Sequence, residues 1–460
     1  GIEASLRRIA HYDFWSNKVR RSVLFDSKAD VIIYGEGEKT VVELAACIRD
    51  DQDFSAVRGI CYIATEANEK YIELPSFEEV NSDKDKFIEM FDKFYVNNDP
   101  LNAKGLCQAH ANRWLIQNPP QYYMGTKELD KLHAYGFMYD IHPDYKEQGT
   151  VKALETIQFS LMSHRGCYGE CNFCSITVHY GRTIRSRSER SIVEEAKKMI
   201  KHPGFKGYIS DVGGATANMF GNHCDIQETT GSCKKKRCSF PSLCENMHQS
   251  HKRQIELLKR LRALPNVKKV FVGSGVRHDL VLQDKTFGQA YLENIVRHHV
   301  SGQMKIAPEH TEDKVLNAMG KPGKESLVKF KKDFDDLNKK AGLKQFLTYY
   351  FIAAHPGCSI LDTEKMQEFI KRELKLNPEQ VQIFTPTPST YSTMMYHTGV
   401  NPMDKKEIFV EKDPNRKEKQ KELIVGKPKF NKYQGKRPVK KRAEDFDMQK
   451  NRVTAKNKRR

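Results

Sequence analysis

The chain has 460 residues, of which 38% are hydrophobic and 30% charged, so it is long enough for two or three domains. No apolar run approaches 18 residues, so we expect no membrane-spanning helix and no membrane partner. Its 11 cysteines are too few for a disulfide scaffold, and seven of them lie between Cys167 and Cys244. Such clustering indicates metal binding in a reducing compartment, and we expect a cytoplasmic protein.

The formal net charge of +18 is concentrated at the C-terminus. Residues 412–460 contain 19 Lys or Arg against 6 Asp or Glu, which accounts for about +13 of it. Residues 427–460 have few aliphatic side chains and cannot bury enough apolar surface to fold alone. This composition predicts a disordered basic tail, which is either a solubilising terminus or an arm that binds RNA.

The N-terminal part alternates helical and strand-like segments. Residues 1–95 predict the C-terminal part of an α/β domain, and the helical pattern at Gly1 indicates that this domain begins upstream. The expected elements are a helix over residues 1–15, a strand at 31–34, a helix at 40–49, a strand at 60–63 and a helix at 83–95. Residues 96–150 are interpreted as a connector.

A regular alternation of strands and helices begins near residue 155. The expected strands are 156–162, 206–211, 268–272, 302–306, 346–353 and 380–384. The expected helices are 189–201, 249–263, 287–299, 324–341 and 361–375. This order requires a parallel sheet with right-handed crossovers, either a curved partial barrel or an open doubly wound sheet. We assign it to residues 151–400, followed by a C-terminal extension over 401–426.

Three cysteines in a CxxxCxxC pattern follow the first expected strand. They are Cys167, Cys171 and Cys174. A structural zinc site takes four ligands, whereas an iron–sulfur cubane held by three cysteines keeps one iron open. The alternatives are a zinc knuckle completed by His164 or His179, or three ordinary thiols.

Further candidate residues follow the later strands, where the functional residues of a barrel gather. They are Gly213, Gly214, Ser274, Arg277 and Glu309. The glycines allow a backbone to approach a ligand, although a plain turn explains them too. Arg277 can bind a carboxylate, and Glu309 can accept from ligand hydroxyls or an amine. The adjacent His310 is either a proton shuttle or a cap of the following helix.

A second cysteine cluster lies in an insertion at residues 224–244. It consists of Cys224, Cys233, Cys238 and Cys244, separated by 8, 4 and 5 residues. Four thiolates can bind zinc or a second iron–sulfur cluster, and the cations at 234–237 would lower the pKa values of the thiols. His223 and His248 are alternative ligands.

Together these motifs resemble the YgiQ-type radical S-adenosylmethionine (SAM) proteins. The similarity is carried by SHRGCYGECNFCSI, SDVGGATANM, GSGVRHDL, KIAPEHT, AAHPGCS and QVQIFTPTPSTYSTMMY. Ala215 departs from the pattern of radical SAM enzymes in general, in which a glutamate usually follows the two glycines. The resemblance implies a partial (β/α)6 TIM-like radical SAM barrel, preceded by an α/β domain reminiscent of cobalamin-binding modules. Because that domain begins upstream of Gly1, a cobalamin-binding motif cannot be checked in the sequence.

The resemblance also implies the chemistry. Cys167, Cys171 and Cys174 would hold a 4Fe-4S cluster whose open iron binds SAM. Gly213, Gly214, Ser274, Arg277 and Glu309 would line the SAM site. A reductant such as flavodoxin or ferredoxin would then drive SAM cleavage to a deoxyadenosyl radical, which acts on a substrate that the sequence does not name.

Two other functions are compatible with the sequence. One is a non-catalytic, metal-stabilised RNA-binding protein in which both cysteine clusters are structural. The other is a methylthiotransferase-like RNA modifier in which the four-cysteine insertion holds an auxiliary cluster that donates sulfur.

Overall fold

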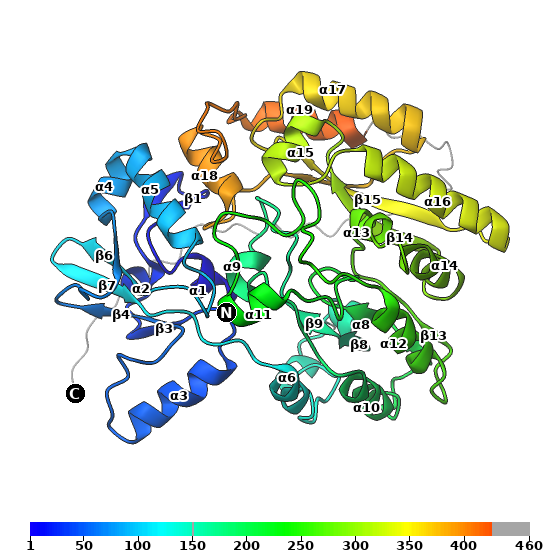
Figure 1. Cartoon of the computed structure of the whole chain (residues 1–460), viewed down its shortest axis with the longest axis horizontal. Helices are drawn as coiled ribbons and strands as arrows, with labels where there is room; N and C mark the ends of the chain where they lie inside the picture. The colour runs from blue at the N-terminus through cyan, green and yellow to red at the C-terminus, as the bar shows by residue number, and fades with distance from the viewer. Residues whose placement is uncertain (150, 426–460) are drawn as a thin grey trace, which may run out of the picture. The chain divides into compact units, whose positions relative to one another are not determined.

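A computed structural model describes residues 1–149 and 151–425 (Figure 1). Its N-terminal part is built on a five-stranded sheet in the order β3-β4-β7-β6-β5. The strands are β3 (Val31–Ile33), β4 (Ile60–Ala64), β5 (Ile72–Leu74), β6 (Leu106–His110) and β7 (Arg113–Gln117). The helices of this part are α2 (Val23–Ser27), α3 (Glu38–Arg49), α4 (Phe77–Ser82), α5 (Lys84–Tyr95), α6 (Thr126–Leu132) and α7 (Pro143–Lys146). Neighbouring strands are antiparallel except for β5 and β6, so the predicted mixed α/β class is confirmed.

Two predictions for this part are wrong in detail. The expected helix over 1–15 is only α1 (Ile2–Leu6), and a hairpin of β1 (His11–Asp13) and β2 (Lys18–Arg20) follows it. Tertiary contacts override the helical pattern there, because the backbone amide of Ala10 donates to Gln108 Oε1 at 3.0 Å. The expected elements also lack β5, β6 and β7, which complete the sheet.

Parallel strands in consecutive order form the second part of the structure. They are β8 (Ser160–Met162), β11 (Tyr208–Ile209) with β12 (Asp211–Gly213), β13 (Lys269–Val270), β14 (Gln303–Glu309), β15 (Phe346–Ala353) and β16 (Gln380–Ile383). β12 pairs with β8, β11 with β13, and β15 with both β14 and β16. A parallel bridge between Val276, which follows β13, and Ile306 of β14 joins the third and fourth strands of the barrel.

This strand order decides between the two predicted sheets. A doubly wound sheet reverses its strand order at a switch point, whereas consecutive parallel strands keep every crossover helix on one side and curve into a barrel. The helices lie outside the strands (Figure 1). They are α10 (Glu189–Met199), α12 (Lys252–Arg262), α13 (His278–Gln283), α14 (Gly288–His298), α15 (Asp313–Met319), α16 (Glu325–Ala341) and α17 (Ile360–Phe369), which continues as a π-helix over Ile370–Leu374. The predicted partial (β/α)6 barrel is therefore confirmed.

The first barrel strand is shorter than expected. Residues Leu154–Ile157 form the short helix α8, and β8 begins only at Ser160. Ile157 is 60% exposed, so it contributes little to the core despite its apolar side chain. The remaining strands and helices occur close to their predicted positions.

The barrel core forms where strand and helix side chains meet. It includes Leu161, Ile209, Val212, Val270, Ile306, Phe351 and Val381 from the strands and Ile192, Leu257, Ile295 and Phe330 from the helices, all buried. Burying each such side chain contributes about 1.5–3 kcal/mol. This core holds the strand ends, and hence the loops beyond them, in fixed positions.

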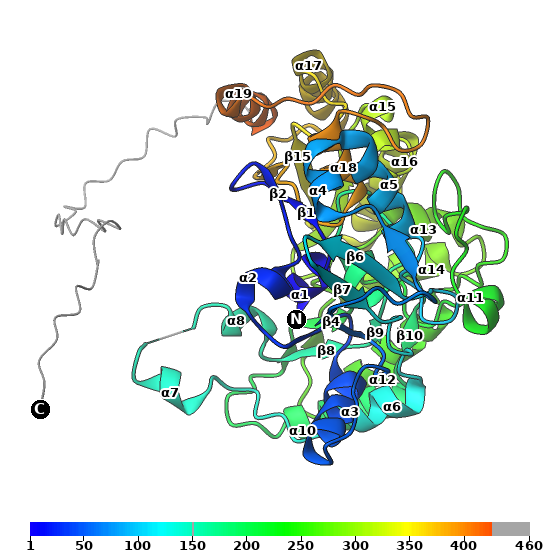
Figure 2. The same cartoon turned by 90° about the vertical axis from the view of Figure 1, so that its left-hand side faces the viewer.

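The C-terminal helices attach to both parts. α18 (Tyr391–Thr398) lies beside α5 in both views (Figures 1 and 2). The ring centroids of Tyr391 and Phe91 are 4.9 Å apart. α19 (Pro414–Val425) covers α17, and its Gln420 side chain accepts from the amide of Ala354 at 3.1 Å. The described residues form one compact unit, and the predicted domain boundaries stay predictions.

Two predictions concern other properties. The disordered tail and its RNA-binding role fall on residues 427–460, outside the described residues. Within the described ranges, no helix combines the length and the apolar character needed to cross a lipid bilayer.

Asp284 joins three helices and makes stability depend on pH. Its buried carboxylate accepts from the backbone and Nδ1 of His251, each at 2.8 Å, and from the Phe287 amide at 2.9 Å. Burial tends to raise the pKa of Asp284, but these hydrogen bonds outweigh it and lower the pKa to about 2. A lowered folded-state pKa gives stability that is present above the unfolded pKa of about 4 and lost as the pH falls toward 2.

We therefore expect Asp284→Asn to lower the free energy of unfolding at neutral pH by about 1–2 kcal/mol. The difference between variant and parent should shrink between about pH 4 and pH 2, because the parent loses its charge there. Denaturant unfolding at several pH values measures it. A difference that stays constant down to pH 2 would show that the carboxylate charge is not responsible.

Candidate active site

The CxxxCxxC loop runs from β9 (His164–Arg165) to α9 (Ile176–Tyr180) at the mouth of the barrel. Gly166 opens it with φ +87°, and a Cβ atom there would overlap the carbonyl of Thr183. A Cβ at Gly169 would overlap the guanidinium of Arg277. Only glycine fits at these two positions, so the chain can turn tightly beneath its cysteines.

Buried polar contacts hold the loop in shape. Glu170 has φ +47°, which is unfavourable for a residue with a Cβ. Its carboxylate accepts a hydrogen bond at 3.1 Å from Arg182, which lies in the loop before β10. β10 itself spans Arg185–Ser186. The Asn172 side chain donates to the Ala318 carbonyl at 2.8 Å, which ties the loop to α15.

All three cysteines of the motif line one cavity of about 160 Å³. The other lining residues include Phe173, Ala215, Thr216, Gly275, Arg277, Glu309 and Lys321, and none of them is a cysteine. No three thiols among the described residues have their sulfur atoms within 4.8 Å of one another. Tetrahedral zinc would bring them to about 3.8 Å, whereas a cubane spreads its ligands because each thiolate binds a different iron. The thiols are therefore not at the spacing of a zinc site in this structure.

The thiols also need a positive partner. Burial raises the pKa of Cys174 to about 12, and repulsion from Cys171 and Cys167 adds to the increase. A bound iron centre would remove this cost, because it deprotonates its thiol ligands. The donor set is thus suited to a metal cluster.

Arg277 provides a fixed cation beside the thiols. Its Nε and Nη2 atoms pair with Asp279 at 3.1 and 2.6 Å, which leaves Nη1 directed toward Cys171 Sγ at 3.9 Å. Burial lowers the pKa of Arg277, but attraction to Asp279 and Cys171 outweighs this effect and raises it. The guanidinium therefore stays charged and can donate to a sulfur atom.

Glu309 and Lys321 form the opposite wall. Glu309 ends β14 with φ +69°, after a shift in the strand register, and its carboxylate lies 3.8 Å from Lys321 Nζ. The ammonium also donates to the carbonyl of Ala307. Burial raises the pKa of Glu309, and Lys321 only partly offsets this. A strained, buried carboxylate directed into a cavity is typical of a ligand-binding residue.

Three predicted residues lie behind the cavity and are not part of its wall. A Cβ at Gly214 would come within 2.7 Å of the His164 carbonyl, so close packing explains this glycine. Gly213 packs on Ser274, whose hydroxyl donates to Asp211. Ala215, which follows the two glycines, does lie on the cavity wall.

The candidate histidines are placed elsewhere. His310 Nδ1 accepts from the Glu312 amide at 3.0 Å, next to the start of α15, and its Nε2 lies 3.4 Å from Cys358 Sγ. This hydrogen bond lies just before the helix, and α15 itself has no side-chain cap. His164 contacts the Ser163 hydroxyl and His179 contacts Ser5, each at 2.8 Å, so neither completes a zinc knuckle.

Three cavity residues were not identified from the sequence. Thr216 Oγ1 lies 3.4 Å from Cys167 Sγ, and Asp279 orients Arg277. Asp279 stands two residues from Arg277, so its charge was an available signal. Lys321 follows α15 in a polar stretch without any motif, and only the fold brings it to the cavity.

The four-cysteine loop packs directly onto the CxxxCxxC loop. Arg237 donates to Asn172 Oδ1 at 2.7 Å and to the Glu170 carbonyl at 3.3 Å. Arg182, the partner of Glu170 in the CxxxCxxC loop, in turn donates to the Cys233 carbonyl of the four-cysteine loop at 2.8 Å. One of the cations expected to act on the thiols of its own loop thus binds the neighbouring loop.

Three of the four cysteines, Cys224, Cys238 and Cys244, lie near one another without forming a closed ligand group. Cys224 and Cys238 are buried, and Cys233 and Cys244 are partly exposed. In the described structure no three of them form a ligand group within 4.8 Å, so their arrangement is not that of a zinc site. The second metal centre stays a prediction.

We expect Arg237→Ala to loosen the contact between these loops and to lower the free energy of unfolding by about 1–3 kcal/mol, because the Asn172 side chain loses a charged donor. Hydrogen exchange of residues 233–239 should become faster. Lys235→Ala, in the same loop but exposed, should change neither quantity. Equal effects of both variants would contradict the docking role.

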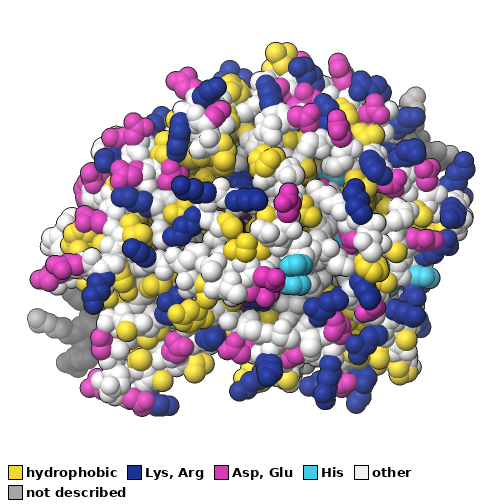
Figure 3. Space-filling view, in the orientation of Figure 1, with side chains coloured by type: hydrophobic (Ala, Val, Ile, Leu, Met, Phe, Trp, Pro, Cys, Tyr) yellow, Lys and Arg dark blue, Asp and Glu magenta, His cyan; other side chains and the backbone are white. Residues whose placement is uncertain are grey.

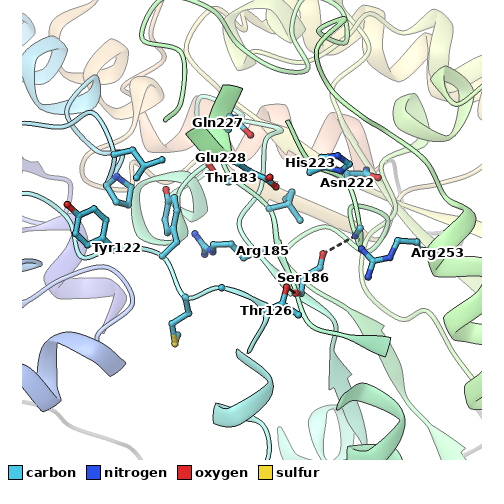
Figure 4. A pocket seen from close by; sticks show the side chains of 17 residues that line it. Tyr122, Thr126, Thr183, Arg185, Ser186, Asn222, His223, Gln227, Glu228 and Arg253 are labelled. Carbon is cyan, nitrogen blue, oxygen red and sulfur yellow. Dashed lines mark hydrogen bonds between the residues drawn. The ribbon is translucent and has the colours of Figure 1, made fainter. Parts of the chain in front are cut away.

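A larger cavity, of about 510 Å³, lies between the connector and the barrel loops (Figure 4). Its wall includes Tyr122, Arg185, Asn222, His223 and Arg253. Ser186 Oγ accepts from the Gly221 amide at 2.9 Å on the same wall. None of the motif cysteines lines it, so it is separate from the candidate active site.

Comparison with known families gives this architecture a class. Residues 1–160 match the family model described as radical SAM N-terminal, and residues 379–434 match a domain of unknown function. The chain, with this domain in front of the barrel and its cysteine loop, is a member of the radical SAM class.

Individual relatives give the family. A UPF0313 protein of Fusobacterium nucleatum is 52% identical over 429 residues, which cover 93% of this chain and 76% of the relative. A UPF0313 protein of Clostridium botulinum is 44% identical over 92% of this chain and 66% of its own length. The chain belongs to the UPF0313 (YgiQ-type) family, as its motifs predicted.

Two solved structures were also matched. The radical SAM methyltransferase TsrM from Kitasatospora setae has a TM-score of 0.45 at 12% identity, with 85% of this chain and 56% of TsrM covered. The cobalamin-dependent SAM radical enzyme OxsB has a TM-score of 0.45 at 15% identity, with 78% of this chain and 38% of OxsB covered.

Proposed function

We propose that this chain is a radical SAM enzyme in which Cys167, Cys171 and Cys174 hold a 4Fe-4S cluster and the adjoining cavity receives SAM. The proposal rests on the composition of the cavity wall. One tight loop supplies three thiols to this wall and no fourth. A reduced cluster of this kind, when bound, supplies the electron that cleaves SAM to methionine and a deoxyadenosyl radical.

The side chains around the thiols have distinct proposed roles. Arg277 would donate from Nη1 toward the cluster sulfur atoms and stabilise their negative charge. Glu309 would accept from the amino group or the ribose hydroxyls of SAM, and Lys321 would hold that carboxylate in position. This assigns Arg277 to the cluster rather than to the SAM carboxylate.

Anaerobic reconstitution with iron and sulfide tests the proposal. The protein should become brown, show a cluster signal by electron paramagnetic resonance after reduction, and form 5′-deoxyadenosine from SAM. Reduced flavodoxin or ferredoxin should replace dithionite as the electron donor. A colourless zinc protein that forms no deoxyadenosine would support the non-catalytic, RNA-binding alternative instead.

A second candidate is favoured by the docking of the four-cysteine loop on the CxxxCxxC loop. A second cluster in that loop would lie next to the first, as a methylthiotransferase-like RNA modifier requires. Changing Cys233 and Cys238 together should then abolish sulfur transfer while SAM cleavage continues. Cobalamin binding, also a proposal, is tested by incubating the protein with hydroxocobalamin and recording the spectrum after gel filtration.

A further inference from the structure

The four-cysteine loop is closed at its neck by two histidines. His223 and His248 form an isolated antiparallel bridge, in which each backbone amide donates to the other residue's carbonyl, at 3.4 and 2.9 Å. Directly paired residues of an antiparallel bridge carry their side chains on the same face. The two imidazole rings are accordingly stacked, with centroids 4.7 Å apart and planes 17° from parallel.

A carboxylate joins the histidines on this face. Cys224 is extended, with φ −144° and ψ 119°, so its neighbours His223 and Asp225 point to one side while its own thiol is buried on the other. Asp225 is the first residue of α11 (Asp225–Thr230). Histidine and acidic side chains are exposed together over this region of the surface (Figure 3).

The three side chains converge on one point. Asp225 Oδ2 lies 3.3 Å from His248 Nε2, and Asp225 Oδ1 lies 3.8 Å from His223 Nε2. One nitrogen or oxygen atom from each residue lies within 4.8 Å of the other two, and within residues 1–149 and 151–425 no other set of three does so.

We propose that His223, Asp225 and His248 bind a divalent transition-metal ion of the Zn²⁺ type. Metal–ligand bonds of about 2.0–2.2 Å place neighbouring ligand atoms about 3–3.5 Å apart, so these atoms, now within 4.8 Å of one another, would move closer and the stacked rings would turn toward the ion. Two imidazoles with one carboxylate select zinc and similar ions over calcium and magnesium, which prefer oxygen ligands.

The position of the site indicates a role. A metal bound across the bridge would link the two ends of the four-cysteine insertion and hold that loop against the CxxxCxxC loop. His223 also lies on the wall of the larger cavity (Figure 4). Because the described residues supply three ligands at this point, the ion keeps a coordination position for water or for an anionic group bound in that cavity.

Zinc titration of the full chain tests this site. The cysteines of the insertion would compete for zinc, so the background variant is Cys233→Ser/Cys238→Ser, reconstituted anaerobically. Zn²⁺ affinity is measured by competition with a chromophoric chelator at neutral pH. His248→Ala and Asp225→Asn should each weaken Zn²⁺ binding by more than about 100-fold, the upper loss seen when only an outer-shell partner is removed.

His142→Ala is the matched control, because His142 is exposed and lies 3.4 Å from Asp144 but has no second histidine beside it in the same group. Its Zn²⁺ affinity should equal that of the background. The zinc absorption edge should show nitrogen and oxygen ligands with imidazole scattering and no sulfur. Unchanged affinity in His248→Ala, or sulfur in the coordination shell, would overturn the proposal.

Discussion

Replacing Cys174 by serine is expected to lower 5′-deoxyadenosine formation from SAM by more than about 100-fold. Cys174 lies on the wall of the 160 Å³ cavity, and only Cys167 and Cys171 would remain to hold the cluster. A serine hydroxyl ionises far less readily than a thiol and is a poor ligand for iron. Losing a ligand should therefore cost more than the 10–100-fold typical of an outer-shell partner.

Two measurements distinguish this loss from a folding defect. Iron and sulfide content should fall together with activity, while far-ultraviolet circular dichroism stays at the parent value. Cys47→Ser makes the same chemical change on α3, at a partly exposed thiol outside the cavity, and should keep the parent rate. Parent-level deoxyadenosine from Cys174→Ser would show that the cluster assignment is wrong.

Glu170→Gln is expected to lower the free energy of unfolding by about 3–5 kcal/mol. The side chain of Glu170 is 3% exposed and that of its partner Arg182 is 14% exposed. Burial lowers the pKa of Arg182, but the carboxylate of Glu170 outweighs it and raises the pKa. A guanidinium stays charged even without this carboxylate because its intrinsic pKa is far above neutral pH, so a neutral amide leaves that buried charge uncompensated.

Denaturant unfolding of the metal-free chain measures this effect. The control is Asp336→Asn, which breaks the exposed i, i+4 pair with Lys332 and should cost no more than about 0.5 kcal/mol. Cluster loading should also fall in Glu170→Gln, because the backbone at this residue has φ +47° and relaxes once the ion pair is lost. If the two variants unfold alike, the buried pair does not stabilise the loop.

The alternation of apolar strands and amphipathic helices after residue 155 was sufficient to predict a parallel α/β sheet, and the family resemblance favoured a barrel over a doubly wound sheet. Strand and helix periods are properties of short segments, and consecutive βα units leave few topologies open. The CxxxCxxC loop was predictable for a similar reason, because three ligands within eight residues belong to one tight turn. Arg277 and Glu309 followed from their places at strand ends, where side chains of a barrel converge.

Other features depend on contacts between residues distant in sequence. The hairpin at residues 11–20 replaces part of a predicted helix because its two strands pair with each other and the side chain of Gln108 binds the amide of Ala10 just before them. Lys321 reaches Glu309 only because α15 returns its end to the barrel mouth.

The contacts between the two cysteine loops and the histidine site also depend on residues that are distant in sequence. Arg237 follows three lysines, and the sequence does not show which of these four cations contacts another loop. Folding places the guanidinium of Arg237 against Asn172. His223 and His248 are separated by the whole cysteine insertion until a backbone bridge pairs them. The sequence alone thus determined the alternating strands and helices and the thiol loop, whose patterns are local. Only the tertiary structure decided which distant side chains meet, because those contacts depend on how the whole chain packs.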